Sequence, residues 1–183
     1  VWANTEGKTG GNVGIILRED RVLAVDAQYP VSGADFRRSI GNVTDKPVTH
    51  LLLNHYHGDH VFGNQAFEDC AIVAHRLLRE RTEENLRTIW APCNLEKLIE
   101  DVRRNRPEVA PLYEGLRIVL PTVTFDERFG IDGVEMIHTG GHTACSSIVY
   151  VPGERVLFAG DLLFAQRFPW AGDPSADPDR WIE

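Results

Sequence analysis

The chain has 183 residues, of which 43% are hydrophobic and 25% charged, and its formal net charge is −8 at pH 7. This length suits one well-packed domain and is short for two, so we expect a single domain over residues 1–183. The negative charge argues against a nucleic-acid partner, because a phosphate backbone requires clustered Lys and Arg. Since no hydrophobic run approaches the ~20 residues that span a bilayer, we expect no membrane segment.

The cysteines and the start of the chain bear on the compartment. Cys70, Cys93 and Cys145 form no C-x-x-C pair, which fits neither a disulfide scaffold nor a zinc ribbon and favours a reducing compartment. The chain opens with Val-Trp-Ala and shows no signal sequence. We therefore predict a cytoplasmic protein, with a periplasmic or secreted protein as the alternative if a signal peptide was removed.

The first part of the chain predicts two paired strands, a helix and a further strand. Residues 12–17 and 22–25 are β-rich runs joined by a polar turn, which indicates an antiparallel hairpin. An N-cap at Ser32 predicts a helix that ends near residues 41–42, and residues 48–53 predict the next strand.

Asp26 directly follows the second strand of that hairpin. A charge there is costly unless it reaches backbone amides or supports a metal site from beneath. The alternative is an ordinary turn carboxylate.

Three imidazoles and one carboxylate follow the strand 48–53, in the segment Asn-His-Tyr-His-Gly-Asp-His over residues 54–60. Imidazole and carboxylate groups bind zinc and similar divalent metals, and they would repel one another without a cation. His55 and His57 are two residues apart and can reach one ion from a loop, whereas Asp59 and His60 lie one turn onward. The segment therefore predicts a metal site, with a second metal beside the first.

The middle of the chain predicts mainly helices. His75 is expected to open a helix that runs to about Thr88, and Asn94 to cap a second amphipathic helix. The expected core positions of that second helix are Leu95, Leu98, Ile99 and Val102. From its position alone, we hypothesise that the insert 76–111, with Trp90 near its midpoint, shapes the substrate. The remaining predictions here are a short helix from Val61 to Phe67, a strand at 71–73, and a structural role for His50.

From Leu116 the chain is β-rich, and we expect a second sheet to begin there. The predicted strands are 118–120, 123–125, 134–137, 147–151 and 156–159. Two β-rich halves with helices between them fit an α/β class fold, a four-layer αββα sandwich in which two sheets face each other.

Two of these late strands end in further metal-ligand candidates. His142 lies in a glycine-rich loop, where the backbone can turn sharply and approach an ion, and Asp161 follows the last predicted strand. A carboxylate has two oxygens, so Asp161 can bridge two ions. His138 is interpreted as a packing or supporting residue, and Cys145 as a buried thiol with a metal ligand as the alternative.

The segment H-x-H-x-D-H followed by Gly63-Asn64, together with the later G-H-T and strand-G-D segments, resembles the metallo-β-lactamase fold superfamily. The resemblance implies a zinc-dependent metallohydrolase of the αββα fold that acts on a small-molecule substrate, with Asp59 orienting a metal-bound hydroxide. It also implies two Zn²⁺ ions, with iron or manganese as alternatives. The implied ligands are His55, His57 and His142 for one ion, and Asp59, His60 and Asp161 for the other.

The carboxylate at Asp161 resembles hydroxyacylglutathione hydrolases and lactonases more than β-lactamases, which have cysteine there. We therefore expect hydrolysis of an ester, thioester, lactone or amide. The alternatives are a β-lactamase proper, a mononuclear iron enzyme similar to persulfide dioxygenases, and a degenerate, non-catalytic metal-binding domain. Metal content and hydrolysis of a thioester, a lactone and a β-lactam separate these alternatives.

One feature of the superfamily is absent from this sequence. Members with two metals present a further histidine near the C-terminus, and no histidine follows His142. Asp177-Pro178 is a good N-cap and first-turn pair that stands close to the end of the chain. We therefore expect a domain truncated at its C-terminus.

Overall fold

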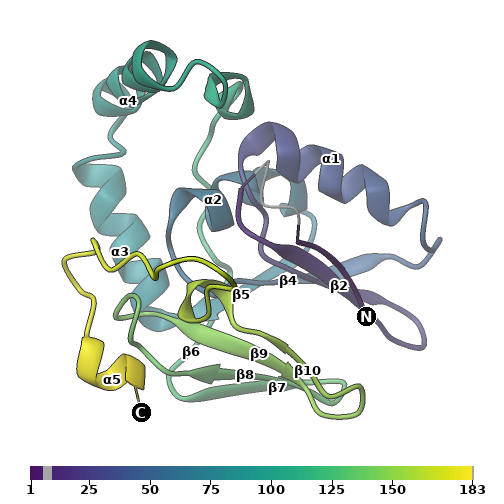
Figure 1. Cartoon of the computed structure of the whole chain (residues 1–183). Helices are drawn as coiled ribbons and strands as arrows, with labels where there is room; N and C mark the ends of the chain where they lie inside the picture. Colours follow the sequence, from purple (N-terminus) through teal and green to yellow (C-terminus); the bar gives the residue numbers. More distant parts are fainter. Residues whose placement is uncertain (6–9, 183) are drawn as a thin grey trace.

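The computed structural model describes residues 1–5 and 10–182. Within these residues, two β-sheets face each other, and most of the helices lie on the outer side of the first sheet (Figure 1). The two facing sheets confirm the predicted sandwich. The assignment of residues 1–183 to one domain stays a prediction.

The first sheet has six described strands in sequence order, β1 to β6. β1 and β2 pair antiparallel with their successors, whereas β3 to β6 run parallel. Parallel neighbours require crossover connections, which here contain helices or helical turns. The strands are Trp2–Asn4, Val13–Leu17, Val22–Val25, Val48–Leu52, Ala71–His75 and Val123–Phe125.

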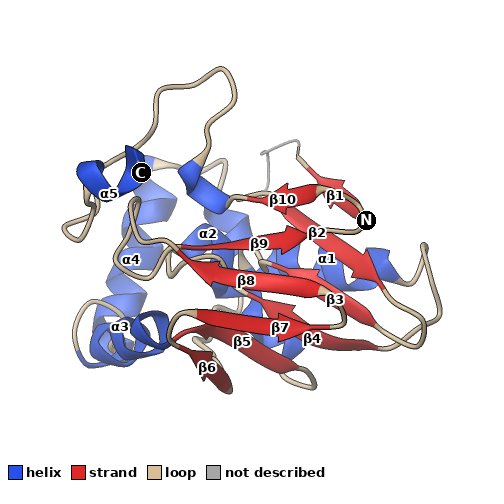
Figure 2. Ribbon diagram, turned by 90° about the horizontal axis from the view of Figure 1, so that it is seen from below, coloured by secondary structure: helices blue, strands red, loops and turns tan. Residues whose placement is uncertain are grey.

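The second sheet has four described strands in the order β10-β9-β8-β7, all antiparallel (Figure 2). Inward-facing side chains alternate with outward-facing ones along β8 and β9, as expected for a sheet with one face on a core. The strands are Arg128–Ile131, Val134–His138, Ser147–Val151 and Val156–Phe158.

The helices and helical turns connect these strands. None of the described helices is both long enough and hydrophobic enough to cross a bilayer. The α-helices are α1 Pro30–Ile40, α2 Gly58–Val61, α3 Arg76–Arg87, α4 Pro92–Asn105 and α5 Pro178–Ile182. The 3₁₀ turns are η1 Phe62–Phe67, η2 Ala110–Tyr113 and η3 Gly160–Leu162.

Two hydrophobic clusters make the core. One lies between the first sheet and its helices, and includes Leu51, Phe67 and Ile72. The other lies between the two sheets, where Leu52 and Val73 meet Met136 from β8. Residues 51 and 52 thus face opposite sides of one strand, and both are fully buried. A strand buried on both faces explains why β4 is hydrophobic at its end instead of alternating.

The predicted hairpin, the strand before the metal-ligand segment and the helix after His75 are confirmed, while several boundaries were wrong. The helix α1 begins at Pro30, two residues before the expected cap, and Ser32 hydrogen-bonds back to Tyr29. The helix α4 begins at Pro92, because proline is well suited to the first turn, and Asn94 lies inside it.

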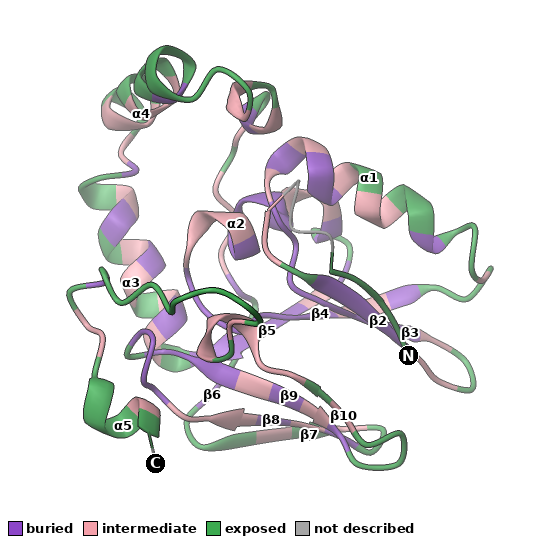
Figure 3. Cartoon of the chain, in the orientation of Figure 1, coloured by how far each residue is buried: buried purple, intermediate pink, exposed green. Residues whose placement is uncertain are grey.

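The burial of α4 also differs from the prediction. Val102 is its buried residue, while Leu95, Leu98 and Ile99 pack against the core and stay partly exposed. Figure 3 shows this helix largely exposed or half-buried. The hydrophobic spacing predicted the correct face but overestimated its burial.

In the β-rich second half, two strand predictions were wrong. Residues 118–120 form no strand, and the strand Val123–Phe125 joins the first sheet beside β5. The second sheet therefore begins at Arg128. The strands β1 and β7 were missed, because Trp2–Asn4 is short and exposed and the run Arg128–Ile131 contains a glycine.

Candidate metal centre

The loop after β4 carries the first histidines of the site. His55 is fully buried, and its Nε2 lies 3.1 Å from Nδ1 of His57. His57 is the residue before α2, and both Asp59 and His60 lie in that short helix. The ring of His60 packs against that of His55, with ring centroids 4.1 Å apart.

Two loops of the second sheet complete the cluster. His142 follows β8 through Gly140 and Gly141, which have φ values of 70° and 91°, a left-handed conformation that favours glycine. Its Nε2 lies 3.0 Å from His57 Nδ1. Asp161 comes from η3 after β10, and its Oδ2 lies 3.7 Å from His142 Nε2.

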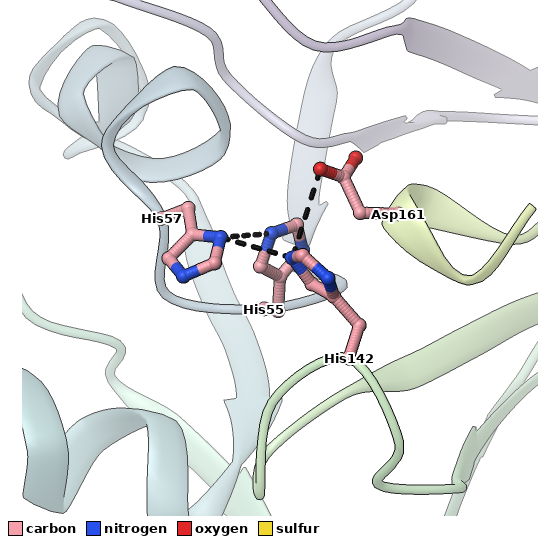
Figure 4. A group of neighbouring side chains, drawn as sticks. All are labelled: His55, His57, His142 and Asp161. Carbon is pink, nitrogen blue, oxygen red and sulfur yellow. Dashed lines mark hydrogen bonds and ion pairs between the residues drawn. The ribbon is translucent and has the colours of Figure 1, made fainter. Parts of the chain in front are cut away.

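Together, four side chains present ligand atoms that all lie within 4.8 Å of one another (Figure 4): those of His55, His57, His142 and Asp161. The structure thus brings together the three histidines predicted to share one ion. It also places beside them the carboxylate predicted to bridge to a second.

The other predicted ligands also lie near that carboxylate, and the ring of His60 lies 4.1 Å from that of His55. His60 Nε2 is 3.1 Å from Asp161 Oδ1 and 3.8 Å from Asp59 Oδ2. Asp161 therefore presents Oδ1 to His60 and Oδ2 to His142.

The outer ring nitrogens of three histidines each meet an acceptor. His60 Nδ1 lies 2.8 Å from Asp26 Oδ2, His142 Nδ1 lies 3.1 Å from the Trp170 carbonyl oxygen, and His57 Nε2 lies 2.9 Å from Asp173 Oδ2. A ring nitrogen that donates a proton outward leaves the inner nitrogen as a lone pair. Convergent lone pairs with supporting acceptors are the arrangement found around protein-bound metals, so these residues fit a divalent cation.

Burial and neighbouring charges set the protonation of the cluster. Burial lowers the pKa of His55 well below its usual value, and the other histidines lower it further. Burial also opposes charge on His60, but the carboxylates of Asp26, Asp59 and Asp161 outweigh it and raise the pKa of His60 well above its usual value. The pKa shifts of His55 and His60 are therefore opposite, because His55 has histidine neighbours and His60 has carboxylate neighbours.

The structure decides between the two interpretations of Asp26. It is buried, it accepts a hydrogen bond from the Asn54 amide, and it contacts His60, so it supports the cluster and is not a simple turn residue. Its φ of 56° explains why a short polar side chain stands there.

Other residues singled out in the sequence lie away from the cluster. His75 caps α3 by accepting a hydrogen bond from the Leu77 amide, and His138 stacks on it. His50 contacts Thr49. Cys145 is buried beside Thr143, and burial raises the pKa of its thiol to about 11, which fits a packing role.

In the segment after Asp161, sequence reasoning missed Asp173 as part of the site. Trp170 packs its ring 5.3 Å from that of His57, and Asp173 hydrogen-bonds to both His57 and Tyr56. An isolated Asp among prolines and glycines carries no periodic signal, and its partners lie more than 100 residues away in the chain.

Comparison with known proteins identifies the class. The family model of the metallo-beta-lactamase superfamily matches residues 7–182, and the chain belongs to this superfamily. Its fold is shared with a metallo-beta-lactamase from Pontibacter korlensis, at 21% identity and a TM-score of 0.67 over 93% of this chain and 69% of the other. It is also similar to TTHA1623 in a di-iron-bound form, at 21% identity and a TM-score of 0.67 over 100% of this chain and 82% of the other.

Among individual relatives, a hydroxyacylglutathione hydrolase of Rhizobium meliloti (strain 1021) is 32% identical over 161 residues. The match covers 84% of this chain and 48% of the relative. The chain therefore spans about half the length of this curated relative.

Proposed function

We propose that this protein is a zinc-dependent hydrolase with a dinuclear site, which uses an activated water to cleave an ester, thioester, lactone or amide. The observation that carries the proposal is the position of Asp161, whose two oxygens face His142 on one side and His60 on the other. In this assignment His55, His57 and His142 hold one ion, while Asp59, His60 and Asp161 hold the second. The donor set of imidazoles and carboxylates suits zinc, and it also accepts iron or manganese.

When bound, a divalent ion would lower the pKa of a coordinated water to about 7 and would polarise a carbonyl oxygen. The protein's own residues position the water and the ligands. The side chain of Asp59 is 35% exposed, more than that of Asp161 at 25%, and it orients the attacking water and accepts its proton. Asp26 holds the ring of His60 through Nδ1, which keeps Nε2 directed at the site.

Among the possible substrates, a thioester is favoured. The relative at 32% identity is a hydroxyacylglutathione hydrolase. The carboxylate at Asp161, in place of cysteine, also agrees with that branch of the superfamily. The overall likeness to metallo-beta-lactamases, at 21% identity or less, supports the fold and not their substrate.

The experiment is elemental analysis of the protein purified without added metal, combined with hydrolysis assays on a generic thioester, a lactone and a chromogenic β-lactam. We expect about two zinc ions per chain and turnover of the thioester above that of the β-lactam. Asp59→Asn should lower kcat by about 10²- to 10⁴-fold. Because Asp59 is also an assigned ligand of the second ion, the variant should bind that ion more weakly. Glu80→Gln, which changes an exposed carboxylate of α3, is the matched control and should leave kcat unchanged.

Other results would change the assignment. One iron per chain with no hydrolysis would replace the hydrolase by a mononuclear oxygenase. Preferential turnover of the β-lactam would assign β-lactams, instead of thioesters, as the substrate class. Absence of bound metal at micromolar zinc would contradict the proposal as a whole.

A further inference from the structure

Asp173 is a buried carboxylate whose two oxygens serve different partners. Its side chain is 2% exposed. Oδ1 accepts hydrogen bonds from the backbone amide of Ser175 at 2.8 Å and from its hydroxyl at 2.6 Å. Oδ2 accepts from His57 Nε2 at 2.9 Å and from the hydroxyl of Tyr56. One oxygen therefore holds its own loop, and the other reaches the candidate metal centre.

The tautomer of His57 matters for the cluster, because ring nitrogens of two other histidines lie close to its Nδ1. A hydrogen-bond acceptor at Nε2 can determine that tautomer. Its Nδ1 lies 3.1 Å from Nε2 of His55 and 3.0 Å from Nε2 of His142. A neutral imidazole carries its proton on one of the two nitrogens, and only the tautomer protonated at Nε2 has a free lone pair at Nδ1. An ionised carboxylate against Nε2 can only accept, so it favours that tautomer.

Tyr56 fixes the carboxylate in this position. Its ring is buried, its hydroxyl donates to Asp173 Oδ2, and the guanidinium of Arg81 lies 5.7 Å from the ring centroid. With Ser175 on one oxygen and Tyr56 on the other, the carboxylate cannot rotate without losing hydrogen bonds. Its orientation toward His57 is thus set before any ligand arrives.

From this geometry we propose that Asp173 is a positioning residue for the metal centre, which selects the Nε2-protonated tautomer of His57 and so presents Nδ1 as a ligand. The inference rests on the proposed role of His57 in metal binding. The proposal assigns a function to the loop after Asp161, which carries Asp173. This loop would then affect the metal affinity of a site whose ligands lie elsewhere in the chain.

Asp173→Asn tests the proposal with little change in shape. The backbone amide of Ser175 can only donate, so it keeps the oxygen of the new carboxamide in the place of Oδ1 and turns the NH₂ group toward His57. That NH₂ group donates to Nε2 and favours the tautomer with the proton on Nδ1, where the metal should bind. The matched control is Ser175→Ala, which weakens the anchoring of the loop and leaves Oδ2 untouched.

The first measurement is a titration of each metal-free protein with Zn²⁺ in competition with a chromophoric chelator. We expect Asp173→Asn to weaken binding by about 10- to 100-fold, as for other residues that support a metal ligand. Ser175→Ala should stay within about twofold of the wild type. Equal losses of zinc affinity in both variants would overturn the proposal, because Asp173 would then act only as a loop anchor. Unchanged zinc affinity in Asp173→Asn would also overturn it.

The second measurement is independent of metal binding and of catalysis. Long-range ¹H–¹⁵N NMR spectra of the ¹⁵N-histidine-labelled, metal-free wild type report the tautomer of each ring. We expect His57 protonated at Nε2, and a wild-type ring protonated at Nδ1 alone would overturn the proposal. This readout needs no variant to fold, and it still decides the role of Asp173 if the wild type binds no zinc and the proposed function fails.

Discussion

His75 and His138 lie face to face, with ring centroids 3.7 Å apart and planes inclined by only 8°. His75 ends β5 of the first sheet and His138 ends β8 of the second, so the stacked pair joins the two sheets. Each ring donates from Nε2 to a backbone carbonyl, His75 to Asp126 and His138 to Ala144. The second of these bonds holds the loop that carries His142.

The stacked pair predicts a loss of stability in mild acid. Burial, and then the neighbouring His138, lower the pKa of His75 from 6.5 to about 4. Because the folded-state pKa is depressed, the neutral ring contributes full stability above pH 6.5, and this contribution is lost as the pH falls toward 4. At pH 5 the loss relative to pH 7.5 should be about 2 kcal/mol.

Urea unfolding of metal-free protein at about pH 7.5 and about pH 5 measures this loss. His75→Asn keeps a residue suited to cap α3 and removes the titrating ring, so the variant should lose about 2 kcal/mol less than the wild type over the same interval. An equal loss in both proteins would show that the acid sensitivity comes from other groups.

Asp26→Asn should weaken the second half of the metal centre. Asn tolerates the left-handed backbone at this position, so the main change is the loss of charge against His60. We expect zinc affinity to fall by about 10- to 100-fold, and the metal-free protein to be destabilised by about 3–5 kcal/mol because a buried ion pair loses one partner. Chelator competition and urea unfolding measure the two effects, and Asp20→Asn on the surface is the control.

Gly63→Ala should destabilise the fold strongly. A Cβ at Gly63 would lie 2.0 Å from the carbonyl oxygen of Ala27, which belongs to the backbone and cannot move aside. We expect a cost of at least about 3 kcal/mol in the free energy of unfolding. Gly153→Ala is the control, since a Cβ there would meet no described atom within 4 Å, and it should change stability by less than about 0.5 kcal/mol. Similar unfolding midpoints for the two variants would contradict the packing argument.

Trp90→Ala should act on stability rather than on substrate choice. Trp90 is 6% exposed, and its ring packs 5.2 Å from that of Phe62 in the core beside α2. Truncation of a buried tryptophan costs about 3–5 kcal/mol. The ratio of kcat/KM for two thioesters of different acyl size should stay unchanged at a temperature where the variant is folded. A changed ratio would support the hypothesis that the insert 76–111 shapes the substrate.

The side chains singled out as ligands lie close together in the fold, whereas several predicted element boundaries were wrong. Their role as metal ligands stays a prediction. The ligand candidates could be identified because histidine and aspartate stand directly after hydrophobic strands. The end of each strand then determines where the side chain lies. Asp26 and Asp161 are examples, since each follows a strand and each contacts His60. A local sequence pattern was sufficient there, because the strand itself determines the position of the residue that follows it.

Features that depend on distant contacts were not predictable in this way. Val123–Phe125 was assigned to the second sheet because it follows other β-rich residues, yet it pairs with β5, which lies far earlier in the chain. The role of Asp173 depends on His57, which lies 116 residues away in the chain. In both cases the sequence shows the residue type, but only tertiary pairing shows the partner.

The division of the ligands between the two sheets has a consequence for biosynthesis. His55, His57 and His60 emerge from the ribosome early, whereas His142 and Asp161 emerge much later. Because domains fold as units and a metal site forms with its fold, a nascent chain that ends before Asp161 offers only part of the coordination sphere. Under the proposed ligand assignment, tight loading with metal is therefore a late event in synthesis.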